Sequence, residues 1–160
     1  MPVFISHRKS DADLARGVFN YLESKSVQAY LDELDENLQN SSNITAVILT
    51  RLSQCSHLLA IVTQNTNGSW WVPWEIGVAT KSDTRIASIT RQLDRNTLPA
   101  YLKLWPLLGY TVPDLDKFIE LYKADSRVLL ERRDMLKAGA AQIRTADDFH
   151  RAMMRATGQL

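Results

Sequence analysis

Residues 58–89 read LLAIVTQNTNGSWWVPWEIGVATKSDTRIASI, and this stretch decides the fold. Its apolar run 58–62 predicts a strand that is buried on both faces. Pro73 suits the first position of a helix, because its missing N–H has no partner to lose there, so we expect a helix from Pro73 to about Lys81. The run 86–89 then predicts another buried strand. Strand, helix and strand in this order predict a parallel sheet with a right-handed crossover.

The residues before this stretch repeat the same alternation of strand and helix periods. The runs 3–5 and 27–31 predict two further strands. Between them, a capping-box pattern at Ser10 and Asp13 predicts the start of a helix. A second helix is expected over residues 44–52, which carry apolar side chains at helical spacing.

The last 60 residues predict an edge of the sheet followed by helices. Residues 98–110 are apolar and aromatic but contain two prolines, which favours an edge strand with irregular flanks. A capping-box pattern at Thr145 and Asp148 predicts the start of the last helix. We therefore expect an α/β domain with a central, mostly parallel sheet and helices on both faces, followed by further helices near the C-terminus. The expected helices span residues 115–122, 127–137 and 147–157.

Composition excludes several classes of protein. The chain has 160 residues, 45% of them apolar and 23% charged, which is typical of one soluble globular domain. A formal net charge of +1 predicts no broad basic surface for nucleic acid. No apolar segment approaches the roughly 18 residues that span a bilayer, and residues 1–6 read as a strand without signal-peptide features. We expect a cytoplasmic protein that binds neither nucleic acid nor membrane.

Metal and disulfide chemistry are not expected either. Cys55 is the single cysteine, so it cannot form an internal disulfide. His7, His57 and His150 lie far apart in the sequence, without the spacing of metal ligands. We therefore predict no metal site.

In an open parallel sheet, ligands bind at the carboxyl ends of the strands, near the point where the strand order reverses. The third strand of the chain ends at Thr63 and is followed by a loop with Trp70 and Trp71 before the helix at Pro73. The other strands contribute polar and charged side chains at the same edge. They are Ser6, His7 and Arg8 after the first strand, and Asp32, Glu33, Leu34 and Asp35 after the second.

Three of the four tryptophans fall within five positions, at Trp70, Trp71 and Trp74. Their spacing follows neither the helical period of 3.6 residues nor the strand period of two, so a single hydrophobic core cannot bury all three rings. Glu75 is expected at the third position of the helix, where a carboxylate complements the helix dipole by less than about 1 kcal/mol. The functional alternative is that aromatic rings bind a flat heterocycle and exclude water around the carboxylate.

Three motifs in order resemble those of TIR (Toll/interleukin-1 receptor) domains. Residues 3–7, Val-Phe-Ile-Ser-His, resemble the opening strand of that family, and residues 30–32, Tyr-Leu-Asp, resemble the end of its second strand. Residues 69–76 are similar to the motif of enzymatic TIR domains, in which a tryptophan precedes the catalytic glutamate by four positions. Here that pair is Trp71 and Glu75. The likeness covers roughly residues 1–125, which are therefore the expected TIR domain, and leaves residues 126–160 as a helical extension packed on the same domain. The sequence looks similar to small, stand-alone bacterial proteins such as the TIR component of Thoeris-type anti-phage defence.

The resemblance implies a flavodoxin-like three-layer TIR fold and an enzyme that cleaves NAD⁺ at its nicotinamide–ribose bond. It implies Glu75 as the catalytic residue and NAD⁺ as a substrate, with no bound cofactor. The product would be a cyclic ADP-ribose-type signal or ADP-ribose. Self-association through TIR–TIR contacts is expected, with a phage-derived trigger and a separate effector protein that receives the signal. Substrate binding is expected of Ser6, Arg8, Asp32, Leu34, Trp71 and Trp74.

Several of these residues also have a structural interpretation. Trp71 would serve as a packing ring, Arg8 as a surface arginine, and Asp32 would shape the following turn. Ser6 is not expected to be a nucleophile, because no histidine and acid are placed to form a triad with it.

Other functions stay open at this point. A non-catalytic adaptor that docks to another TIR domain is the main alternative, and another N-glycosidic enzyme is a third. A dehydrogenase or P-loop enzyme is disfavoured, because Gly68 is isolated and the order Gly-x-Gly-x-x-Gly is absent.

Overall fold

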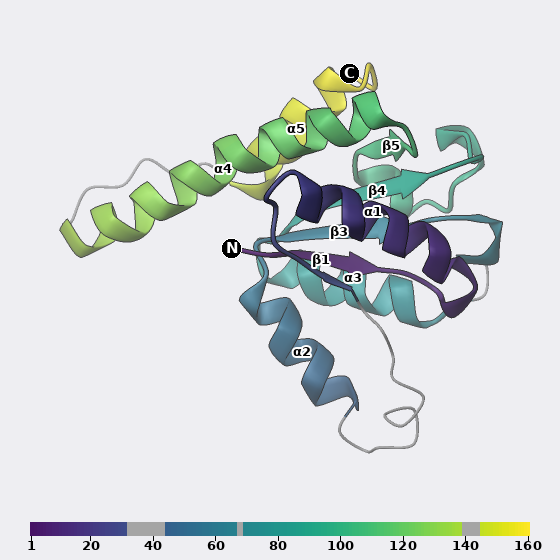
Figure 1. Cartoon of the computed structure of the whole chain (residues 1–160), viewed down its shortest axis with the longest axis horizontal. Helices are drawn as coiled ribbons and strands as arrows, with labels where there is room; N and C mark the ends of the chain where they lie inside the picture. Colours follow the sequence, from purple (N-terminus) through teal and green to yellow (C-terminus); the bar gives the residue numbers. More distant parts are fainter. Residues whose placement is uncertain (32–43, 67–68, 139–144) are drawn as a thin grey trace.

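The sheet positions every other element of the chain. The computed structural model describes residues 1–31, 44–66, 69–138 and 145–160, and within them five parallel strands lie in the order β2-β1-β3-β4-β5. The chain places β2 on one side of β1 and β3 on the other, so the strand order reverses between β1 and β3 (Figure 1). This is the flavodoxin-like order, and it confirms the predicted α/β fold. The strands are β1 (Val3–Ser6), β2 (Ala29–Leu31), β3 (His57–Ile61), β4 (Arg85–Thr90) and β5 (Leu107–Gly109).

Helices cover both faces of the sheet. Successive side chains of a strand face opposite layers: Val3 and Ile5 pack in the core cluster of α1, α4 and α5, whereas Phe4 packs in the cluster of α2 and α3. Figure 1 shows α1 and α4 on one side of the sheet and α2 and α3 on the other. The helices are α1 (Ala12–Ser24), α2 (Ile44–Gln54), α3 (Trp71–Lys81), α4 (Val112–Ala138) and α5 (Ala146–Ala156), with short 3₁₀ helices η1 (Lys9–Asp11), η2 (Gln64–Thr66), η3 (Arg95–Thr97) and η4 (Leu102–Leu104).

The strands predicted at 3–5, 27–31, 58–62 and 86–89 match β1 to β4 to within about two residues at their ends, whereas β5 covers only Leu107–Gly109 of the edge segment expected at 98–110. The edge strand is confirmed as β5, which is short and follows η3 and η4. The prediction of separate helices at 115–122 and 127–137 is wrong, because α4 is one helix over Val112–Ala138. No glycine or proline interrupts residues 114–137, and a helix without a breaker continues. In Figure 1 the green α4 extends beyond the edge of the sheet. The division at residue 125, which lies inside α4, stays a prediction.

The two predicted capping boxes have different outcomes. The box at Ser10 and Asp13 is wrong: α1 begins after Asp11, and no side-chain hydrogen bond caps it. The carboxylate of Asp11 instead accepts hydrogen bonds from the turn after β3. The box at Thr145 and Asp148 is confirmed at the start of α5, where the Thr145 amide donates to Asp148 Oδ2 at 2.9 Å.

Polar contacts attach α4 and α5 to the amino ends of β3 and β4. Arg85, the first residue of β4, donates from Nε to Asp125 Oδ2 in α4 at 2.8 Å. His150 in α5 accepts a hydrogen bond from the Ile86 amide at 2.9 Å. Both contacts are buried. They lie at the opposite end of the sheet from the carboxyl edge, where the candidate site is found.

Candidate functional site

Ser6 and Glu75 meet at the carboxyl end of β1. The Ser6 hydroxyl donates a hydrogen bond to Glu75 Oε2, although 69 residues separate the two in the sequence. Ser6 has the same strand parity as Phe4, so it faces the layer of α2 and α3. Both side chains are fully buried, and β1 is one of the two strands between which the strand order reverses. The pair therefore lies where the topology of an open sheet places a ligand site.

Glu75 lies on the buried face of α3. The buried residues of this helix are Val72, Glu75, Ile76 and Ala79, which is the i, i+3, i+4, i+7 stripe of a helix packed on a core. A carboxylate in such a position costs free energy, because burial removes its hydration. Glu75 occupies a position that an apolar side chain would fill more stably, and this points to a chemical role.

The start of α3 corrects the prediction for this residue. The helix begins at Trp71, not at Pro73, and the Trp70 carbonyl accepts the first helical hydrogen bond from Trp74 N at 3.2 Å. Pro73 is still tolerated, because the first-turn N–H groups have no partner inside a helix. Glu75 is thus the fifth helical residue, and α3 has no acidic residue in its first turn. Complementing the helix dipole therefore does not explain Glu75, since that effect is confined to the first turn.

The three neighbouring tryptophans divide between solvent and core, as their spacing predicts. Trp70 is 90% exposed. Trp71 and Trp74 are half-buried and stack on each other, with ring centroids 5.1 Å apart and planes inclined by 26°. Both pack against the core cluster of α2 and α3. The stack holds an aromatic surface within four residues of the Glu75 carboxylate.

A hydrogen-bonded network joins the turns after β1 and β3. Arg8 is exposed and donates to the backbone carbonyl of Asn65 in η2. Asp11 is buried and accepts from Thr63 Oγ1 and Asn65 Nδ2, each at 2.9 Å. Sequence reasoning missed Asp11, because the pattern of Ser10 and Asp13 suggested a helix cap instead. The network keeps Arg8 at the same edge of the sheet as Ser6.

Two predicted site residues, Asp32 and Leu34, lie outside the described residues. Of the others, the structure brings Ser6 and Glu75 together by a direct hydrogen bond, and Trp71 and Trp74 by ring stacking. Arg8 lies two residues beyond Ser6 and contacts η2. The burial of Glu75 could have been predicted from the sequence. Val72, Ile76 and Ala79 recur at helical spacing on one face of α3, and Glu75 lies on that same apolar face.

Cys55 and His57 lie away from this edge, before and at the start of β3. Burial raises the pKa of the Cys55 thiol to about 12, so the nucleophilic thiolate is suppressed. Burial, with a smaller contribution from Arg85, lowers the pKa of His57 well below its ordinary value. His57 lies at the amino end of β3, 3.7 Å from Asp125. In the described ranges, no three His, Cys, Asp or Glu side chains group as metal ligands would.

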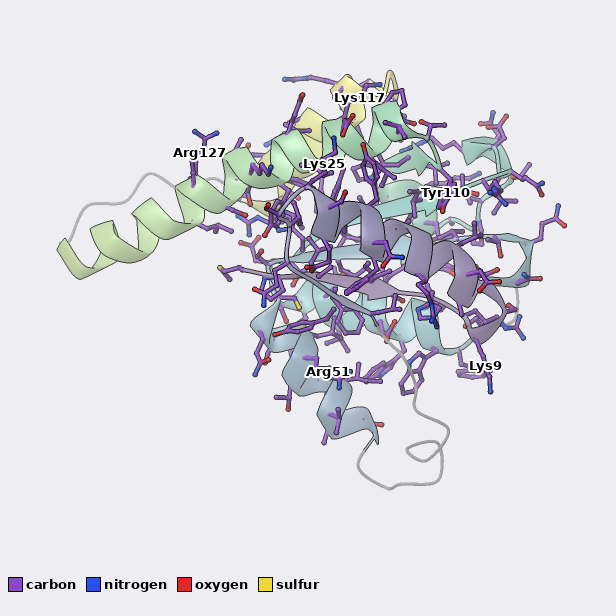
Figure 2. The ribbon with its side chains drawn as sticks, in the orientation of Figure 1. Lys9, Lys25, Arg51, Tyr110, Lys117 and Arg127 are labelled. Atoms are coloured by element: carbon purple, nitrogen blue, oxygen red, sulfur yellow. The ribbon has the colours of Figure 1, made fainter. Side chains whose placement is uncertain are left out.

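Basic side chains are distributed over several elements. Figure 2 shows Lys9 before α1, Lys25 after it, Arg51 on α2, and Lys117 and Arg127 on α4. Lys25 and Lys117 lie near acidic partners, with Lys25 Nζ 3.5 Å from Asp116 Oδ1. These five side chains thus form no single basic patch. No helix in the part of the chain that the structure describes has the length and apolarity needed to cross a membrane.

Comparison with known proteins points to one family. A family model described as TIR domain matches residues 3–116. The probable 3' cyclic ADP-D-ribose synthase ThsB' of Bacillus cereus (strain MSX-D12) is 28% identical over 79 residues, which are 47% of this chain and 41% of that protein. The match thus spans about two fifths of the length of this curated relative. TIR domains in the structure of the activated Roq1 resistosome, which directly recognizes the pathogen effector XopQ, superpose with a TM-score of 0.50. They share 14% identity, with 98% of this chain and 83% of that chain covered.

Proposed function

The chain belongs to the TIR domain family, and on that premise we propose that it cleaves NAD⁺ at the nicotinamide–ribose bond with Glu75 as the catalytic carboxylate. One observation carries the proposal: a fully buried glutamate, hydrogen-bonded by Ser6, at the carboxyl edge where the strand order reverses. The similarity to the Bacillus cereus protein, a probable 3' cyclic ADP-D-ribose synthase, supports the same chemistry.

The chemistry needs a carboxylate and no general acid. When the bond between ribose C1′ and the pyridinium nitrogen breaks, the electron pair leaves with nicotinamide, which departs as a neutral molecule. Positive charge then develops on the ribose as an oxocarbenium-like species. An ionised Glu75 beside the ribose stabilises that charge and orients the sugar hydroxyls, in the manner of glycoside-cleaving carboxylates.

The neighbouring residues have supporting roles in this proposal. Ser6 is a positioning residue, because its hydrogen bond fixes one oxygen of the Glu75 carboxylate. Arg8 binds the diphosphate of the substrate, since a guanidinium matches two phosphate oxygens. Trp71, backed by Trp74, stacks on a ring of the substrate. Asp32 and Leu34, which follow β2 in the sequence, are proposed to complete the substrate site.

The burial of Glu75 bears on how activity is controlled. The carboxylate is 0% exposed, so the site must open before the ribose can reach it. We propose that association with further TIR domains favours the open state, and that activity per chain rises with protein concentration. A closed resting state suits an enzyme that responds to a trigger, because NAD⁺ is then spared until the trigger arrives.

The cation that forms on the ribose has two fates. Water can add to C1′ and lose a proton, which yields ADP-ribose, or a nucleophile of the same molecule can add and lose its proton, which yields a cyclic product. We favour the cyclic product, as a signal in bacterial anti-phage immunity that passes to a separate effector protein. The setting that fits this role is the cytoplasm, with a phage-derived trigger.

A second function is favoured by a single observation. Trp70 is 90% exposed at the start of α3, and exposed aromatic rings are typical anchors of protein interfaces. A non-catalytic adaptor that docks to another TIR domain would use such a ring. Docking to another TIR domain does not require a buried glutamate in α3.

Product analysis tests the proposal and separates these alternatives. The purified chain is incubated with NAD⁺ over a range of protein concentrations, and the products are separated by chromatography. Nicotinamide with a new cyclic nucleotide indicates a cyclase, and nicotinamide with ADP-ribose alone indicates a hydrolase. If no nicotinamide is released at any concentration, the enzymatic proposal is overturned and the adaptor is favoured.

A further inference from the structure

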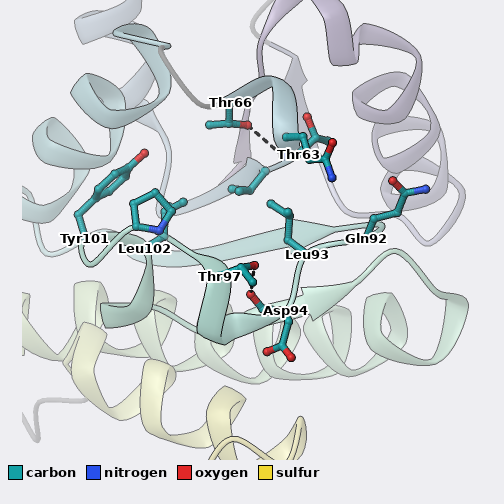
Figure 3. Close-up of a pocket in the computed structure, with 11 residues that line it drawn as sticks. Thr63, Thr66, Gln92, Leu93, Asp94, Thr97, Tyr101 and Leu102 are labelled. Atoms are coloured by element: carbon teal, nitrogen blue, oxygen red, sulfur yellow. Dashed lines mark hydrogen bonds between the residues drawn. The ribbon is translucent and has the colours of Figure 1, made fainter.

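A cleft of about 470 Å³ opens at the carboxyl ends of β3 and β4. It lies between the turn that contains η2 and the segment from Gln92 to Leu102, which includes η3 (Figure 3). Its volume falls within the range of small-molecule sites. Among the described residues that the sequence predicted to bind substrate, namely Ser6, Arg8, Trp71 and Trp74, none lines it.

The lining combines an apolar floor with uncharged hydrogen-bonding groups. Val62, Leu93, Pro99 and Leu102 supply the apolar part. Figure 3 shows Tyr101 at one end of the cleft and Gln92 at the other, with Thr66 across from Thr97 and Leu93 between them. The Tyr101 ring is half-buried, and burial raises its pKa. Within the described residues its hydroxyl has no hydrogen-bond partner, so this group is available to a ligand.

This chemistry selects an uncharged, flat ligand. Among the described lining residues, Asp94 is the only charged one, so a phosphate would meet repulsion there and none of these residues would offer it a cation. A purine base has apolar faces for the floor and neutral donors and acceptors for the Gln92 amide and the Tyr101 hydroxyl. Thr63 Oγ1 and Thr97 Oγ1 already donate to Asp11 Oδ2 and to the Asp94 carbonyl, so toward a ligand they can only accept. Base stacking on an aromatic side chain adds to such binding.

The cleft is connected to the Ser6–Glu75 site through η2. Gln64 and Thr66 of η2 line the cleft, while the carbonyl of Asn65, between them, accepts the hydrogen bond from Arg8. Ser6 lies in register with Ala60 of β3, and Thr63 of the cleft follows that strand. Along the edge, the order is therefore a carboxylate, an arginine and a cleft whose described lining residues include no cation. A dinucleotide has the matching order of a ribose to be cleaved, a diphosphate and a second nucleoside.

We propose that this cleft binds the adenosine half of NAD⁺, with Arg8 at the diphosphate. The inference rests on the proposed function for the identity of the substrate, but the binding of adenosine monophosphate (AMP) alone can be measured without turnover. A ligand held at both ends of one sheet edge would place its nicotinamide ribose at Glu75.

Two substitutions test the cleft, each with a matched control. Leu93→Trp fills the middle of the cleft, and Leu104→Trp makes the same change at a side chain that is exposed and outside it. Tyr101→Phe removes only the hydroxyl, and Tyr21→Phe does the same on α1. The dissociation constant for AMP is measured by calorimetry on each variant of the 160-residue chain, after its circular dichroism has been matched to the wild type. In parallel, KM is measured for NAD⁺ and for nicotinamide mononucleotide, which lacks the adenosine half.

We expect Leu93→Trp to weaken AMP binding by at least about tenfold, and Tyr101→Phe by about fivefold, with both controls within about twofold of wild type. Leu93→Trp should also raise KM for NAD⁺ and leave that for nicotinamide mononucleotide unchanged. Equal AMP affinity in Leu93→Trp and Leu104→Trp, or no binding at millimolar AMP, overturns the cleft assignment. Failure of the wild type to release nicotinamide from NAD⁺ overturns the proposed function instead. The dissociation constants for AMP still test the cleft in that case.

Discussion

Acidification should destabilise the chain through His150. This side chain is buried in α5, and its Nε2 accepts a hydrogen bond from the Ile86 amide at 2.9 Å. Only a neutral imidazole can accept at that atom. Burial lowers the pKa of His150 from 6.5 to about 4, with Arg85 acting in the same direction and Asp147 and Asp83 opposing it.

The sign of the effect follows from these two pKa values. Between pH 6.5 and about 4, the unfolded chain binds a proton at His150 and the folded chain does not, so stability falls as the pH falls. The stabilisation is complete above pH 6.5. The difference between the two pKa values corresponds to about 3 kcal/mol in the free energy of unfolding, of which about 2 kcal/mol is lost by about pH 5.

The assay is guanidinium unfolding followed by tryptophan fluorescence across this pH range, on the wild type and on His150→Gln. Glutamine retains an acceptor for the Ile86 amide and does not titrate. Other groups, including His57 and the carboxylates, titrate in both proteins, so the difference between the two curves isolates His150. We expect the variant to lose about 2 kcal/mol less than the wild type between neutral pH and about pH 5. Parallel curves would refute the reasoning.

Three further substitutions or treatments test other parts of the structure. Trp71→Ala should slow nicotinamide release and shift the product ratio toward linear ADP-ribose, because it removes the stacked ring; unchanged rate and ratio on chromatography would contradict a substrate-stacking role. Asp11→Ala should lower the free energy of unfolding by about 1–3 kcal/mol, because Thr63 and Asn65 lose their acceptor, and denaturation curves identical to wild type would refute this. Cys55 should resist iodoacetamide in the native chain at mildly alkaline pH and react after unfolding, since its thiol pKa is about 12; mass spectrometry that detects rapid native alkylation would count against it.

Local patterns were sufficient to predict the sheet. The apolar runs near Val3, Leu58 and Ile86 are each too short for a helix and too apolar for a surface strand, and all three are central strands. The alternation with helical stripes then determines a parallel sheet, because parallel neighbours need crossover connections. The long-range hydrogen bonds of Asp11 were not predictable, because its partners Thr63 and Asn65 lie more than 50 residues away.

The site was predicted in part. The tryptophan cluster and Glu75 were found from the sequence, but the contact of Glu75 with Ser6 depends on how α3 is rotated against β1. The buried stripe of Val72, Ile76 and Ala79 sets that rotation, and a helix expected to start at Pro73 leaves Val72 out of the stripe. The cleft near Tyr101 was not predicted, because it is lined by irregular segments that follow two different strands. Irregular segments have no regular spacing of side chains, so the sequence does not show which of their residues face the same cleft.

The central claim is that the buried carboxylate of Glu75 is required for NAD⁺ cleavage. It is tested most directly by comparing nicotinamide release in wild type, Glu75→Gln and Glu120→Gln. Glu120 is exposed on α4 and serves as the matched control for the loss of one carboxylate. If the claim is right, Glu75→Gln folds with an unchanged circular dichroism spectrum and loses at least about 100-fold in rate, while Glu120→Gln retains the wild-type rate. A folded Glu75→Gln variant that releases nicotinamide at the wild-type rate would contradict it.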